Sequence, residues 1–62
     1  MNKSFKATRI KKNILQRELA ARVGTHPSVI SLIENHSLIP GISTQKKLAR
    51  ALGCKVSKLF PE

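Results

Sequence analysis

Apolar residues recur every three or four positions along this chain of 62 residues, and residues that end helices interrupt the pattern every eight to twelve positions. A spacing of three and four places apolar side chains on one face of an α-helix, whereas a strand would show them at every second position. The sequence therefore predicts an all-α fold of five short helices, forming a single compact domain over residues 1–62 with no internal repeat.

Residues that favour helix starts and ends give the expected boundaries. Asn13 and Gly24 suit the left-handed conformation that ends a helix, Gly53 closes a later helix, and Pro27 suits a first helical position. The expected helices cover residues 4–12, 16–23, 27–34, 42–52 and 56–60. The side chains expected to face the core are Phe5, Ile10, Leu19, Ala20, Val23, Val29, Ile30, Ile33, Ile42, Leu48, Ala49 and Leu52.

The basic residues are confined to the two ends of the chain. Twelve Lys and Arg stand against three acidic residues, a net charge of +9; seven of them precede Val23 and five follow Ile42. A neutral centre between two cationic segments predicts a surface whose edges bind a polyanion. The hydrophobic fraction of 40% excludes a basic disordered tail, which would lack the apolar material for a core.

Composition also excludes several classes of function. With so few carboxylates, we do not expect an enzyme. The lone Cys54 cannot form an internal disulfide and favours a reducing, cytoplasmic location. Cys54, His26 and His36 lack the number and spacing of zinc ligands, so no metal or cofactor is expected. No segment has the length and apolar character of a membrane span. The basic N-terminal segment lacks the aromatic anchors of a helix that binds a membrane surface, and the chain lacks the exposed aromatic residues on which RNA-binding modules stack bases, so we expect neither function.

The second and third helices, separated by the short turn at residues 24–26, have the arrangement of a helix-turn-helix, in which the second helix can enter the major groove. The sequence resembles the lambda-repressor-like (Xre-type) helix-turn-helix regulators from Phe5 to Phe60. The matching segments are LQRELAARVG at 15–24, SVISLIEN at 28–35, the loop residue Pro40, KLARALG at 47–53 and the closing Leu59-Phe60. The resemblance implies a five-helix, DNA-binding transcription regulator, usually a symmetric dimer and commonly a repressor.

The resemblance also implies which residues contact DNA. Residues expected to face the bases are His26, Pro27, Ser28, Ser31 and Leu32, and Gln16 is expected to bind phosphate. Further phosphate contacts are expected from Lys3, Lys6, Arg17, Lys46 and Lys47, and least from Lys55 and Lys58.

This third helix lacks the basic and amide side chains with which many relatives read bases. The loop at residues 36–40 also lacks the basic residues that relatives commonly carry there. We therefore expect a thymine-containing operator that is read partly through its shape. Leu32 has an alternative interpretation as a core residue, and the whole module has one as a protein-binding domain with weak, non-specific DNA binding.

By the same resemblance, Arg9 and Glu34 are expected to form a structural ion pair; the alternative for Arg9 is phosphate binding. Candidate residues for the interface of a weak homodimer are Val56, Leu59, Phe60, Leu38 and Ile39. All five are also candidates for closing the core of so small a domain.

Overall fold

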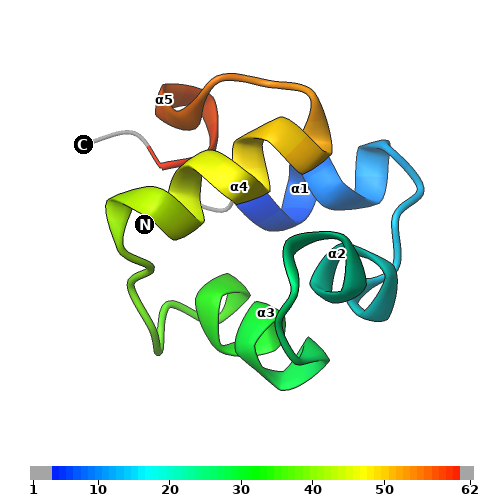
Figure 1. The fold of residues 1–62 in the computed structure, drawn as a ribbon. Coiled ribbons are helices and arrows are strands. Elements are labelled where there is room, and N and C mark those ends of the chain that lie inside the picture. Colours follow the sequence, from blue (N-terminus) through cyan, green and yellow to red (C-terminus); the bar gives the residue numbers. More distant parts are fainter. Residues whose placement is uncertain (1–3, 61–62) are drawn as a thin grey trace.

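The computed structural model describes residues 4–60, and these fold into five helices joined by short loops (Figure 1). The helices are α1 (Ser4–Lys11), α2 (Gln16–Val23), α3 (Pro27–Glu34), α4 (Ile42–Leu52) and α5 (Val56–Leu59). Within residues 4–60 there is no β-strand. The all-α, five-helix prediction is confirmed, and only the ends of α1 and α5 differ from the expected boundaries, each by one residue.

Backbone conformation at the helix ends agrees with the residue types found there. Gly24 ends α2 with φ of 74°, and its amide and that of Thr25 donate hydrogen bonds back into the last turn of the helix. Gly53 ends α4 in the same way with φ of 67°, and Asn13 follows α1 with φ of 57°. These left-handed residues turn the chain sharply, so that short helices can pack around one centre.

Each helix contributes to a single core. α2 packs against α3 and α4, and α5 packs against α1 and α4, as the arrangement in Figure 1 shows. Leu19, Ile30, Leu48, Leu52 and Leu59 are almost fully buried at its centre. Burial of such a side chain contributes about 1.5 to 3 kcal/mol, so these five leucine and isoleucine residues supply much of the driving force for folding.

Four of the expected core residues are not fully buried: Val23 and Val29 are half-buried against the core, and Ile10 and Ile42 are exposed. Ile10 is 53% exposed because the inward face of α1 is formed by Phe5, Thr8 and Arg9, which are spaced by three and four and leave Ile10 to one side. Ile42 is 64% exposed because it is the first residue of α4, remote along the helix from its buried residues. For both residues, the prediction of a buried side chain from its apolar character was wrong.

Candidate nucleic-acid interface

The turn between α2 and α3 fixes the start of the helix that is expected to read bases. α3 begins at Pro27, and His26 caps it: the Ser28 amide donates to His26 Nδ1 over 3.1 Å. The Ser28 hydroxyl oxygen also lies 2.8 Å from this nitrogen. His26 therefore supports the helix start, a structural role besides the base contact expected from the sequence, and it holds the Ser28 side chain at the tip of α3.

The outward surface of α3 carries the residues expected to face DNA. Ser28 is exposed, Pro27 and Ser31 are half-buried, and Leu32 is 44% exposed, while Ile30 and Ile33 on the opposite side are buried. The interpretation of Leu32 as a core residue is therefore wrong. The structure presents a short, uncharged helix surface composed of a proline, two hydroxyl groups and a leucine.

A polar network anchors α3 to α1 and α2. The Arg9 guanidinium donates from Nε to Glu34 Oε2 and, over 3.2 Å, from Nη2 to Glu34 Oε1, so that the two side chains form a bidentate ion pair. Arg9 Nη1 also donates to the Ile14 carbonyl over 2.7 Å. The carboxylate of Glu34 is nearly buried, with 2% of the side chain exposed. Because a buried carboxylate needs partners, this network fixes the position of α3 relative to its neighbours.

Gln16, expected to bind phosphate, belongs to the same network. Its side-chain amide donates to Glu34 Oε1 over 2.9 Å, and the residue is half-buried at the start of α2. One amide hydrogen and the carbonyl oxygen are left for an outside partner. Gln16 thus links the first turn of α2 to the end of α3, a contact that the sequence analysis did not anticipate.

The expected phosphate-binding cations lie at the surface. Lys6 on α1, Arg17 on α2, and Lys46 and Lys47 on α4 are all exposed. Lys3 lies outside the described residues. Since α3 itself has no basic residue, any electrostatic attraction to DNA must come from basic residues outside α3.

The candidate dimer residues differ in their accessibility. Leu59 is fully buried, so of its two interpretations the core residue is confirmed and the interface residue is wrong. Val56 and Phe60 are half-buried, and the Phe60 ring packs on Phe5 with 5.6 Å between ring centroids. Leu38 and Ile39 are 40% and 87% exposed and line a small hollow of about 180 Å³ beside Phe60. Of the five residues, Leu38 and Ile39 are therefore the most accessible to a partner.

Other kinds of site find no support in the part of the chain that the structure describes. Residues 4–60 contain no group of three or more His, Cys, Asp or Glu side chains placed to hold a metal ion. Over the same residues, no helix combines the length and apolar character needed to cross a membrane.

Arg22 and Arg50 are functional candidates that the sequence analysis did not single out. They line a cleft between α2 and α4 together with Lys47. The sequence signal was weak, because 28 positions separate the two arginines and only the packing of α2 on α4 brings them to one opening.

Comparison with known proteins agrees with this architecture. The profile of the helix-turn-helix family matches residues 5–59, nearly the whole described part of the chain. The chain is also similar to an uncharacterized HTH-type transcriptional regulator of Archaeoglobus fulgidus, with 33% identity over 60 residues, which are 97% of this chain and 84% of the relative. The protein belongs to the lambda-repressor-like (Xre-type) helix-turn-helix family of DNA-binding transcription regulators.

Proposed function

We propose that this protein binds a short operator in duplex DNA sequence-specifically, with α3 in the major groove, and that it acts as a repressor in the form of a homodimer. The observation that carries the proposal is the outward surface of α3, where Ser28 and Leu32 are exposed and the helix is fixed in place by Arg9, Glu34 and Gln16. A rigidly held helix with an accessible face is what major-groove reading requires.

Base reading in this proposal relies on few direct contacts. The Ser28 and Ser31 hydroxyls can donate to or accept from several bases, and Leu32 and Pro27 can pack against thymine methyl groups. Such contacts discriminate less than the ~1 to 3 kcal/mol of a bidentate side-chain pair. We therefore infer that the operator contains thymine at the contacted positions and that its shape contributes to recognition.

Affinity in this proposal comes mainly from phosphate contacts by Gln16, Arg17, Lys6, Lys46 and Lys47. Each phosphate neutralised by a basic side chain releases counterions, so the logarithm of the binding constant should fall with the logarithm of salt concentration by roughly 0.9 per contact. The surface exposure of the four cations supports this assignment.

The experiment that tests base reading is selection of bound sequences from random duplexes at two salt concentrations. The expected result is a thymine-containing consensus that persists at the higher salt, because only base and shape recognition survive the weakening of phosphate contacts. A consensus dominated by guanine at the contacted positions would contradict the proposed reading by Ser28 and Leu32.

A substitution then connects the consensus to α3. Leu32→Ala should weaken binding to the selected operator by roughly 3- to 5-fold and leave binding to a scrambled duplex unchanged, because methyl contacts carry sequence information and phosphate contacts do not. Ile10→Ala, which removes a similarly exposed side chain from α1, should change neither affinity. Both are read by fluorescence anisotropy.

A second candidate function is a protein-interaction module with weak, non-specific DNA binding. The observation that favours it is the exposure of Leu38 and Ile39 side by side in the loop after α3, and of Leu32 on α3, since exposed apolar surface often marks protein contacts. DNA binding that is unaffected by Ser28→Ala and Leu32→Ala, together with no consensus in the selection, would support this second function over the first.

A further inference from the structure

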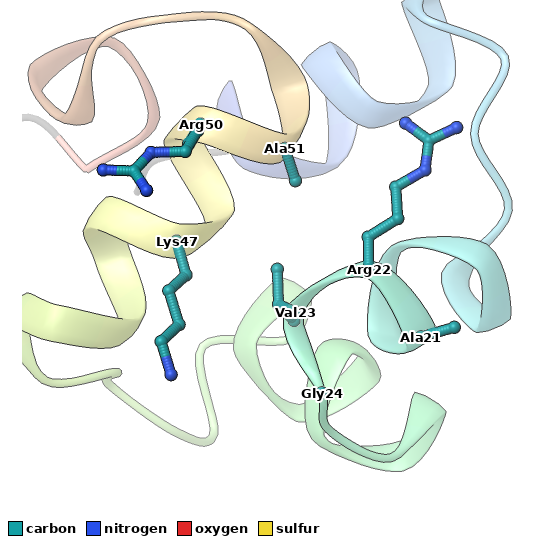
Figure 2. A pocket seen from close by; sticks show the side chains of 7 residues that line it. All are labelled: Ala21, Arg22, Val23, Gly24, Lys47, Arg50 and Ala51. Atoms are coloured by element: carbon teal, nitrogen blue, oxygen red, sulfur yellow. The ribbon is translucent and has the colours of Figure 1, made fainter.

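A cationic cleft with a volume of about 610 Å³ lies between α2 and α4 (Figure 2). Arg22 lines it from α2, and Lys47 and Arg50 line it from α4. Figure 2 shows Val23 and Ala51 between these side chains, so that the cleft has an apolar floor and a basic rim.

The positive charge of the cleft is not neutralised by the acidic side chains that the structure describes. The residues lining it include no carboxylate. Between residues 4 and 60 the acidic residues are Glu18 and Glu34; Glu18 accepts from the Leu15 amide over 3.0 Å, and Glu34 is paired with Arg9. Three exposed cations around one opening therefore create a region of positive potential that attracts anions.

The shape of the cleft favours an extended polyanion over an enclosed small anion. Arg22, Lys47 and Arg50 are exposed, and Figure 2 shows their side chains pointing apart around the opening, without converging on one point. A single phosphate ion could contact only one of them well. Successive phosphates of a nucleic-acid strand, by contrast, could contact all three side chains, since the phosphates are spaced regularly along the backbone.

The cleft is separate from the surface expected to read bases. Gln16 and Arg17, which are proposed to bind phosphate beside that surface, lie in the first turn of α2, whereas Arg22 and Val23 lie in its last turn, about 9 Å away along the helix axis. Ser28 and Leu32 do not line the cleft. A ligand in the cleft would therefore use residues that the α3 surface does not need.

We propose that the α2–α4 cleft is a second DNA-binding surface, in which Arg22, Lys47 and Arg50 contact backbone phosphates. Arg22 and Arg50 are the new assignments, since Lys47 is already counted among the phosphate-binding residues proposed above. The proposal rests on the duplex-DNA binding of the preceding subsection, but not on base reading by α3. Because phosphate contacts carry no sequence information, the cleft should contribute equally to operator and scrambled DNA.

The test compares two double variants that lose the same charge. Arg22→Gln with Arg50→Gln should reduce the salt-dependence slope of binding to a scrambled duplex by roughly 1 to 2, because each lost phosphate contact is worth roughly 0.9. Lys55→Gln with Lys58→Gln removes two exposed cations at α5, outside the cleft, and should leave the slope close to that of the unmodified protein. Both slopes are measured by fluorescence anisotropy between about 50 and 200 mM salt.

Folding is checked by thermal unfolding, and Lys47→Gln alone provides a milder variant whose slope should fall by roughly 0.9. Equal slopes for the two double variants would overturn the proposal while leaving the base-reading function intact. A fall in operator binding without a fall in scrambled-duplex binding would also overturn it, since the arginines would then be contacting bases. If the unmodified protein shows no salt-dependent binding to any duplex, both the cleft proposal and the DNA-binding function fail.

Discussion

At the scale of single residues, the loss of the Arg9–Glu34 ion pair should lower stability substantially. Glu34→Gln keeps the shape of the side chain but leaves the buried Arg9 guanidinium without a countercharge. Breaking such a pair from one side should lower the free energy of unfolding by about 2 to 3 kcal/mol. Urea denaturation followed by circular dichroism measures the change.

Glu18→Gln is the matched control for this residue-scale prediction, because it removes the same charge at an exposed position. A glutamine can still accept the hydrogen bond from the Leu15 amide, so its effect should stay within about 0.5 kcal/mol. The double variant Arg9→Gln with Glu34→Gln should be less destabilised than the sum of its single changes. Equal effects of Glu34→Gln and Glu18→Gln would contradict the importance given to the buried pair.

At the scale of helices, replacing glycine by serine should have opposite effects on stability at two positions, Gly24 and Gly41. Gly24 ends α2 with φ of 74°, and a Cβ there would meet no atom within 4 Å, so Gly24→Ser should cost about 1 kcal/mol from backbone strain alone. Gly41 precedes α4 with φ of −67°, and a Cβ there would also meet no atom within 4 Å. Gly41→Ser should therefore raise the free energy of unfolding by about 0.5 to 1 kcal/mol, because serine caps α4 and restricts the unfolded chain. The midpoints of thermal unfolding should move in opposite directions, by about 4 to 8 °C per kcal/mol. Shifts of the same sign would show that helix-end geometry is not the cause.

At the scale of the whole molecule, the net charge of +9 opposes self-association, whereas the exposed apolar side chains of Leu38 and Ile39 favour it. We therefore expect a monomer in solution that pairs on DNA carrying two half-sites. Ile39→Ser should reduce cooperative binding to such DNA without changing the affinity for one half-site, since Ile39 is 87% exposed and does not support the core. Ile10→Ser on α1 should leave cooperativity unchanged. Analytical ultracentrifugation measures the oligomeric state in solution, and fluorescence anisotropy measures cooperative DNA binding. Unchanged cooperativity in Ile39→Ser would exclude Ile39 from the interface.

Much of the fold was predictable because its signals are local. Pro27, Gly24 and Gly53 mark helix ends through their own backbone preferences, which hold whatever lies around them. His36, which adopts φ of 62° in the loop after α3, carried only a weak signal, because histidine adopts that conformation far less often than glycine. There the hydrogen bond from the Ser37 amide to the Leu32 carbonyl holds the turn.

The candidate site was predictable at the level of residue identity but less so at the level of role. The sequence indicated Gln16 and His26 as DNA contacts, but it did not show that Gln16 is bonded to Glu34 or that His26 caps α3. It left Leu59 between a dimer interface and the core, and Leu32 between the DNA-facing surface and the core, because apolar type alone does not tell which way a side chain points in so small a domain.

By itself, the sequence determined the helices, their ends, the family and the segregation of charge, because each depends on neighbouring residues or on a motif that is continuous along the chain. Tertiary structure decided which apolar residues form the core, which polar groups pair across helices, and where Arg22 and Arg50 meet. Those outcomes depend on helices distant in sequence coming into contact, and burial and pairing exist only once the helices have packed.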